Sequence, residues 1–165
     1  MNTSIEGRTS GRIRLLPKKA EARGFTIIEL MITVVIIAIV AGIAYPSFSR
    51  MSVNGNLRTA ARDIMSDIAG LKGRAMAENT AFSIIFDTGN NNYSFPGMAS
   101  GKSPASFGQG ILLTQVAFGT GNTVSFLTRG TLSQGGNIVL TNSRGSTATI
   151  TCNISGRTYV QFAMQ

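Results

Sequence analysis

The chain has 165 residues, and its 15 lysines and arginines against 7 acidic residues give a formal net charge of +8. It contains no histidine and only one cysteine, Cys152. The chain therefore lacks the commonest general base and metal ligand, and it cannot form an intrachain disulfide or a CxxC site. These absences disfavour an enzyme, and we expect no catalytic residue, no metal and no cofactor.

The first segment, residues 1–24, is basic. Two glutamates, Glu6 and Glu21, stand against six cations, which leaves a net charge of +4. The cations are Arg8, Arg12, Arg14, Lys18, Lys19 and Arg23. Flanks of a membrane helix that are rich in lysine and arginine stay on the cytoplasmic side. We therefore expect residues 1–24 in the cytoplasm and the bulk of the chain outside it.

Residues 25–45 form an apolar run, marked by Phe25, Leu30, Ile36, Val40 and Tyr45. At about 1.5 Å of rise per residue, a helix of this length spans roughly 30 Å, the thickness of a bilayer's hydrocarbon core. One carboxylate, Glu29, interrupts the run, and a charge near the centre of a membrane helix costs about 2.5 to 3.5 kcal/mol. The sequence therefore predicts a membrane-spanning helix whose acid needs a specific cationic partner.

Two simpler interpretations of this run compete. A secretory signal peptide has a basic start, a shorter apolar stretch and a small-residue cleavage site, which Ala41, Gly42 and Ala44 imitate. A plain single-pass anchor explains the length and the charge bias, but it explains neither the acid nor the Gly24-Phe25 junction.

A helical pattern continues beyond the apolar run. Pro46 removes a backbone donor and crowds the carbonyl of Gly42, so we expect a kink there. Apolar residues then recur at spacings of three and four, and the charged residues between them suit a solvated face. The apolar set is Leu57, Ala61, Ile64, Ile68, Leu71 and Ala75, and the charged set is Arg58, Arg62, Asp63, Asp67, Lys72 and Arg74. The sequence predicts one long helix over residues 26–79, which Gly70 and Gly73 weaken unless they pack closely.

From residue 80 onward, short β-prone runs alternate with turns rich in glycine and asparagine. The runs are 82–86, 110–116, 123–127, 137–140, 148–152 and 158–162, and the turns are 89–92, 119–122, 135–136 and 142–145. We expect an α+β fold in which the second half of the long helix packs on an antiparallel sheet or a pair of sheets. Cys152 falls in one of the runs and is expected in the core, with an intermolecular disulfide as the alternative.

The residues Gly24-Phe25-Thr26-Ile27-Ile28-Glu29 resemble the class III signal of type IV pilins and pseudopilins. The resemblance implies that a prepilin peptidase cleaves after Gly24 and that the new amino terminus, Phe25, is methylated. It also implies that Glu29 meets the terminal amine of Phe25 in a neighbouring subunit. The chain would then have a cleaved leader at 1–24, a transmembrane and filament-core helix at 25–55, and a globular domain at 56–165.

The order of the elements is similar to that of the GspH/FimT branch of minor pilins and pseudopilins. This second resemblance is carried by the strand 81–87, by the turn from Phe126 to Gly130 and by the Gly156-Arg157 turn. It implies a minor structural subunit of a type IV pilus, acting in filament initiation or at the tip. A minor pseudopilin of a type II secretion system is the alternative, although Pro46 and the basic leader resemble the pilus group more closely.

The same resemblance implies partners and a location. The partners are other pilins or pseudopilins in a helical filament, prepilin peptidase, and an assembly platform driven by a separate ATPase. The location is the bacterial inner membrane, crossed once, with the leader cytoplasmic and the head periplasmic. After assembly the location is the filament or its tip.

Other motifs point to different ligands. Some FimT-like minor pilins bind DNA through a carboxyl-terminal arginine segment, and Gly156-Arg157-Thr158-Tyr159 keeps one of its two arginines. Lys102, Arg144 and Arg157 are the candidate phosphate contacts, provided that they converge in space. Residues 97–103 imitate a Walker A loop but have one residue too few between the glycines, so we expect a flexible loop. A Ser–Lys pair with Lys72 or Lys102 is the remaining catalytic alternative, and no motif supports it.

Overall fold

The structure is a computed structural model that describes residues 24–119 and 121–165. Leader residues 1–23, and with them the expected cytoplasmic location of the leader, lie outside the described residues. The chain divides into two compact units on either side of the bond between Val40 and Ala41. The described part of the first unit holds the start of helix α1, and the second unit holds the rest of α1 together with the strands.

Helix α1 (Ile27–Ala77) is continuous over 51 residues, close to the predicted 26–79. Local sequence explains where the helix ends. Asn79 takes a left-handed φ of 49°, and the amide of Thr80 donates to the carbonyl of Ala75 at 3.3 Å, which satisfies one of the last carbonyls of the helix. Asparagine tolerates this conformation better than most residues, so the stop is encoded in the sequence.

Pro46 lies inside α1 and does not end it. Proline has no backbone N–H to donate, so the carbonyl of Gly42 loses its helical partner while the helix continues on both sides. The kink expected at Gly42 and Pro46 stays a prediction. A side chain placed on Gly70 or Gly73 would meet nothing within 4 Å, so no packing inside the described chain requires these two glycines.

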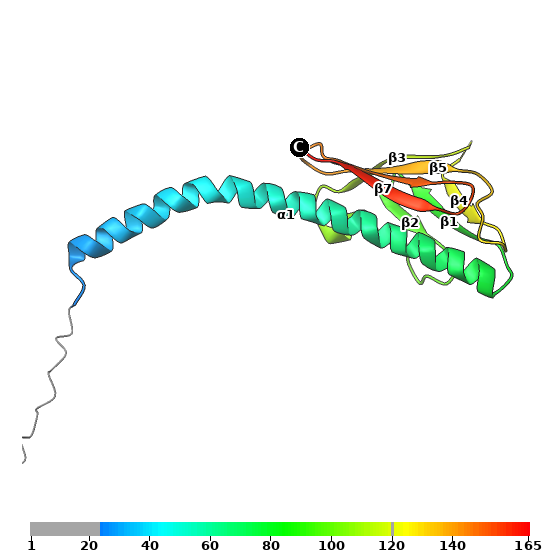
Figure 1. The fold of residues 1–165 in the computed structure, drawn as a ribbon, viewed down its shortest axis with the longest axis horizontal. Helices are drawn as coiled ribbons and strands as arrows, with labels where there is room; N and C mark the ends of the chain where they lie inside the picture. The colour runs from blue at the N-terminus through cyan, green and yellow to red at the C-terminus, as the bar shows by residue number, and fades with distance from the viewer. Residues whose placement is uncertain (1–23, 120) are drawn as a thin grey trace, which may run out of the picture. The chain divides into compact units, whose positions relative to one another are not determined.

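The strands form two antiparallel sheets, which Figure 1 shows gathered beside the second half of α1. The first sheet has the order β2–β1–β4, and its strands are β1 (Phe82–Asp87), β2 (Asn92–Ser94) and β4 (Thr123–Phe126). The second has the order β3–β5–β6–β7, and its strands are β3 (Leu112–Phe118), β5 (Gly136–Thr141), β6 (Thr147–Cys152) and β7 (Thr158–Ala163). The predicted α+β fold, a long helix packed on antiparallel sheets, is confirmed.

One core joins the helix to both sheets. Strand β6 shows how alternation builds it, because Ala148, Ile150 and Cys152 are buried while the threonines between them lie on the other face. The apolar face predicted for α1 is buried as well, with Leu57, Ala61, Ile64, Ile68, Leu71 and Ala75 all at 1% exposure or less. The prediction that Cys152 is a core residue on a strand is confirmed.

Two elements differ from the prediction. Strand β2 lies partly in the segment predicted to be a turn, and a short 3-10 helix, η1 (Pro104–Phe107), directly follows the loop 97–103 where no helix is predicted. Both are short, and both are stabilised by contacts that the local pattern does not reveal. Strand β3 also starts later than expected, and its pairing with β5 shifts register between Leu113 and Gln115, as in a β-bulge.

Candidate functional site

The junction between Gly24 and Phe25 lies just before the start of α1. Both residues are outside the helix and exposed, and the Phe25 side chain is 80% accessible. The Thr26 hydroxyl accepts a hydrogen bond from the amide of Glu29 at 3.2 Å, and the Thr26 carbonyl accepts one from the amide of Leu30 at 3.2 Å. Thr26 therefore caps the helix, and the peptide bond before Phe25 lies in accessible, non-helical chain.

Glu29 lies in the first turn of α1. It is the third helical residue after the Thr26 cap, a common position for an acid at a helix start. A carboxylate here is favoured by the unsatisfied N–H groups and the positive end of the helix dipole. Glu29 is exposed in the single chain. An exposed acid at this position remains available to a cation supplied from outside the subunit.

The apolar run predicted to cross a membrane is exposed along its whole length. Residues 24–48 are all accessible, and none of the most apolar 18-residue window of α1 is buried. The marker residues Phe25, Leu30, Ile36, Val40 and Tyr45 are between 55% and 80% exposed. The helix is long and apolar enough to cross a membrane. Its unburied surface fits membrane anchoring, since a single chain in water would leave this surface exposed at great cost.

A polar network that no pattern in the sequence predicts fastens the loop after β2 to α1. The Lys102 ammonium contacts Asp63 at 2.8 Å and Asp67 at 2.7 Å, and the buried Tyr93 hydroxyl lies 3.1 Å and 2.7 Å from the same two carboxylates. Tyr93 and Lys102 also exchange backbone hydrogen bonds, both at 2.8 Å. The prediction that Asp63 and Asp67 belong to a solvated face is therefore wrong, because both are only partly exposed beneath Tyr93 and Lys102.

Burial is the main reason that the pKa of the Tyr93 hydroxyl is raised, and hydrogen bonds and charges from Asp67 and Asp63 add to it. For Lys102, partial burial lowers the pKa, but the hydrogen bonds and charges of Asp63 and Asp67 outweigh burial and leave the pKa raised. Tyr93 thus remains neutral and Lys102 remains charged near neutral pH. The network is a structural ion cluster, and it supplies no basic amine for a Ser–Lys pair.

Further contacts fix the chain from Ser103 to Gly108, just after the loop that is predicted to be flexible. The Ser103 hydroxyl donates to the carbonyl of Asn91 at 2.7 Å and caps η1. The Asn91 side chain donates to the carbonyl of Ile111 through its nitrogen and accepts from the amide of Leu113 through its oxygen. Any side chain on Gly108 would collide with Asn56 of α1. Ser103 and the residues up to Gly108 are therefore a packed part of the head, and the flexibility expected of the exposed residues before Lys102 stays a prediction.

The three candidate DNA contacts do not converge. Arg144 donates to the Ser49 hydroxyl at 3.0 Å, Lys102 contacts Asp63 and Asp67, and Arg157 follows Gly156, whose carbonyl accepts from Lys72 at 2.9 Å. Ser49 and Lys72 are separated by roughly 35 Å along the helix, at about 1.5 Å per residue. The Lys102 charge is moreover offset by two carboxylates, so a shared phosphate-binding surface of these three residues has no geometric support.

A second polar cluster ties the β5–β6 turn to α1. The Asn54 side-chain oxygen accepts from the Asn142 amide and from the Ser146 hydroxyl, both at 2.9 Å, and the Asn54 amide donates to the Gln165 carbonyl at 3.3 Å. Asn142 and Ser146 are the two buried polar residues among those described. The contacts of the head with α1 therefore reach back to Ser49 and Asn54, before the expected start of the globular domain at residue 56.

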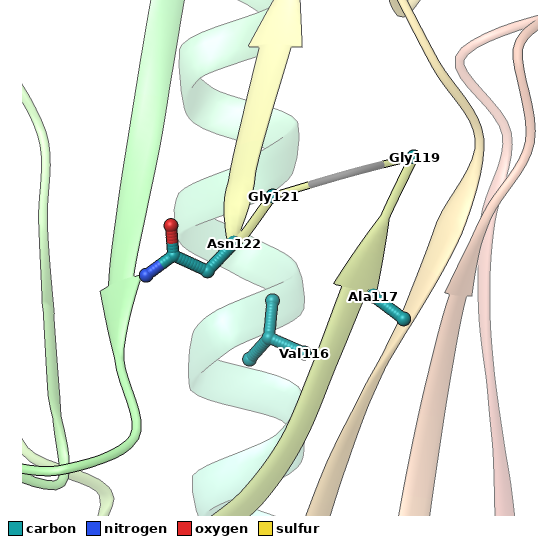
Figure 2. Close-up of a pocket in the computed structure, with 5 residues that line it drawn as sticks. All are labelled: Val116, Ala117, Gly119, Gly121 and Asn122. Atoms are coloured by element: carbon teal, nitrogen blue, oxygen red, sulfur yellow. The ribbon is translucent and has the colours of Figure 1, made fainter.

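A shallow hollow at the end of β3 carries no catalytic chemistry. Figure 2 shows Val116 and Ala117 of β3 on one side of it and Asn122, turned toward β1, on the other. Glycines complete the lining at Gly119 and Gly121. The Asn122 amide donates to the carbonyl of Phe86, so its one polar side chain is already engaged. Within residues 24–119 and 121–165, no group of three or more acidic or cysteine side chains could hold a metal ion.

Comparison with known proteins agrees with the junction and the apolar helix. Residues 20–45 match the family model described as the prokaryotic N-terminal methylation motif. No curated protein and no solved structure matches the chain. The matched segment contains Gly24, Phe25, Glu29 and the apolar run up to Tyr45, and it leaves the head without a counterpart. The chain thus carries the amino-terminal signature of the type IV pilins and pseudopilins.

Proposed function

We propose that the protein is a minor pilin-like structural subunit of a type IV pilus, acting in filament initiation or at the tip. The observation that carries the proposal is the pairing of the methylation motif with a helix whose residues 24–48 are exposed in the single chain. A helix of this kind is stable in a bilayer or in the core of a filament, and the helix of a pilin moves from the bilayer into the filament core during assembly. The head, by contrast, has its own core and can fold around the second half of α1.

The proposed cycle begins with cleavage between Gly24 and Phe25. Cleavage there creates a positively charged amine at Phe25, next to the helix start. In a filament, the Glu29 carboxylate of one subunit pairs with this amine in another, and the pair offsets the cost of burying either charge alone. Burial of the apolar run against neighbouring helices stabilises the assembly, and Glu29 selects its axial register.

Two features bear on the choice between a pilus and a secretion system. Pro46 in the helix and the basic leader favour a pilus subunit. A minor pseudopilin of a type II secretion system is the alternative, and it uses the same processing and the same helix. The location proposed for both is the inner membrane before assembly, with the head on the periplasmic side.

The first test is the amino-terminal residue of the mature protein. We expect mass spectrometry of the chain, co-produced with a prepilin peptidase, to find methylated Phe25 as the first residue. Replacing Gly24 with a bulky residue should leave the leader attached, whereas the same change at Gly55, an exposed glycine farther along α1, should not affect processing. Cleavage after Ala44, as expected for a secretory signal peptide, would overturn the proposal.

The second test separates membrane insertion from assembly. Glu29→Gln removes the charge and keeps the size of the side chain, so insertion should be unchanged while entry into filaments falls. Glu78→Gln is the matched control, because Glu78 is an acid just beyond the other end of α1 that pairs with Arg74 on the surface. Normal incorporation of the Glu29→Gln chain into filaments would contradict the proposed role of Glu29.

A further inference from the structure

We infer that Arg50 and Arg144 form a basic collar that docks the head onto anionic phospholipid headgroups of the bilayer holding α1. The inference rests on the proposed anchoring of residues 25–45 in a membrane and adds a lipid-binding surface to the head. Its consequence is that the stored subunit is held against the membrane by its head as well as by its helix.

Charge is unevenly distributed along α1. Between Glu29 and Asp63 the sequence has no acid, and it has three arginines, Arg50, Arg58 and Arg62. Arg144 belongs to the same end, because its guanidinium donates to the Ser49 hydroxyl at 3.0 Å. The first acid after Glu29 is Asp63, and both Asp63 and Asp67 are already paired with Lys102. Along α1, the charged side chains between the apolar run and Asp63 are therefore all arginines.

Helical rise places two of these four arginines at the headgroup layer. Arg50 follows Tyr45 by five residues, or about 7.5 Å along the helix, and the headgroup region adds roughly 5 to 7 Å on each side of the hydrocarbon core. Arg144 bonds to Ser49, which lies at nearly the same height. Arg58 and Arg62 lie roughly 20 and 25 Å beyond Tyr45, more than a Debye length of about 8 Å from the surface, so we leave them out of the collar.

Arg144 is held at its height by the cluster around Asn54. The amide of Arg144 donates to the Asn142 side-chain oxygen at 3.0 Å, and the Asn142 amide donates to Asn54 of α1 at 2.9 Å. The turn that carries Arg144 is thus fixed to the helix. A cation held in place loses less conformational entropy on binding than one on a free loop, which favours a stable contact.

The neighbouring side chains suit the same boundary. Tyr45 and Phe48 are 76% and 75% exposed, and aromatic residues are enriched where a membrane meets water. Ion pairs among residues 24–119 and 121–165 join Arg74 to Glu78 and Lys102 to Asp63 and Asp67, and none of them uses Arg50 or Arg144. A guanidinium also binds phosphate through a planar pair of donors, which matches a phospholipid headgroup.

The test is arginine-specific footprinting of the full chain in bilayers. The chain is reconstituted in vesicles of phosphatidylcholine alone or with about 30% phosphatidylglycerol, and phenylglyoxal modification of each arginine is followed by mass spectrometry. In the anionic vesicles we expect the modification rates of Arg50 and Arg144 to fall roughly fivefold or more, from the attraction of each arginine to an anionic surface. About 0.5 M salt should restore them.

Internal controls come from the same chain. Arg129 and Arg157 lie in turns near Lys72, so their rates should not depend on the lipid, and those of Arg58 and Arg62 should change little. Equal rates for Arg50 and Arg144 in both vesicle types would overturn the inference, and so would equal protection of every arginine. Protection of the two arginines by inorganic phosphate in neutral vesicles would also overturn the inference. So would protection that occurs only inside assembled filaments, because either result would assign the arginines to another partner.

Resistance to alkaline carbonate extraction, measured on the same vesicles, distinguishes the two possible failures. An extracted chain contradicts the proposed membrane anchoring itself. A chain that stays inserted but shows no lipid-dependent protection contradicts only the collar.

Discussion

The α-carbon of Gly156 packs against the carbonyl oxygen of Gly130, although the two glycines belong to different turns. Both have a left-handed φ of 75°, and both lie against α1, where Lys72 donates to the carbonyl of Gly156 at 2.9 Å. A side chain on Gly130 would in turn collide with Met76. Two turns that the sequence presented as separate motifs therefore form one contact between the sheets and the helix.

This contact predicts that Gly156→Ala destabilises the head strongly. The added methyl group would overlap the Gly130 carbonyl, and alanine resists a positive φ, so we expect a loss of about 2 to 5 kcal/mol. Gly145→Ala is the matched control. Gly145 has a similar φ of 81°, but the nearest atom to a new methyl group is 3.6 Å away, so only the backbone cost of about 1 to 2 kcal/mol remains. Urea unfolding of both variants measures the difference, and equal losses would contradict the steric part.

The Lys102 network predicts a loss of stability at alkaline pH. In the folded protein the pKa of Lys102 is raised above its ordinary value of 10.5, and the pKa of Tyr93 is raised above its ordinary value of 10.0. As the pH rises, the unfolded chain therefore loses these two protons at a lower pH than the folded protein does. The stabilisation is complete below about pH 10 and declines as the pH rises above it. Because Lys102 is partly exposed, solvent screening reduces its share.

Urea midpoints at pH 8 and above pH 10 test this prediction. The wild-type chain should lose stability between the two conditions, and a Tyr93→Phe, Lys102→Met chain should lose less, although it is less stable than wild type at pH 8. An identical alkaline loss in both chains would show that other groups cause it.

The hydrogen bonds of Asn54 predict that its replacement destabilises the turn between β5 and β6. Asn54→Ala removes the acceptor of two buried donors, on Asn142 and Ser146, and each buried group left without a partner costs about 1 to 3 kcal/mol. We expect faster hydrogen exchange in the turn from Asn142 to Ser146 together with lower stability. Ser52→Ala, an exposed change less than one turn away on α1, should be neutral. Unchanged exchange in the turn would mean that the cluster does not hold it.

Cys152 should be unreactive in the folded protein. Burial raises the pKa of its thiol above the ordinary value of 9.0, and Thr158 lies 3.8 Å from the sulfur. Both burial and the raised pKa keep the reactive thiolate scarce. Alkylation should be slow in buffer and fast in urea, and non-reducing gels should show no disulfide-linked dimer. Fast labelling of the native chain would favour the intermolecular disulfide instead.

The main features of helix α1 could be predicted from the amino acid sequence alone. A long apolar helix, its acid at Glu29 and its buried stripe from Leu57 to Ala75 depend on periodicity and spacing along one helix. Such features are local, so they can be read from the chain without knowing what lies nearby. Alternating strands such as β6 could be predicted for the same reason.

The contacts that hold the head together depend on residues that are far apart in the sequence. Asp63 and Asp67 belong to the polar face of α1 by periodicity, yet they are covered because Tyr93 and Lys102, far along the chain, lie against them. Strand β2 and helix η1 are too short to have a pattern of their own, and they exist because these distant contacts outweigh weak local preferences. Whether Lys102, Arg144 and Arg157 met at one place was likewise a question of three-dimensional position, since charge in a sequence does not specify which groups come together.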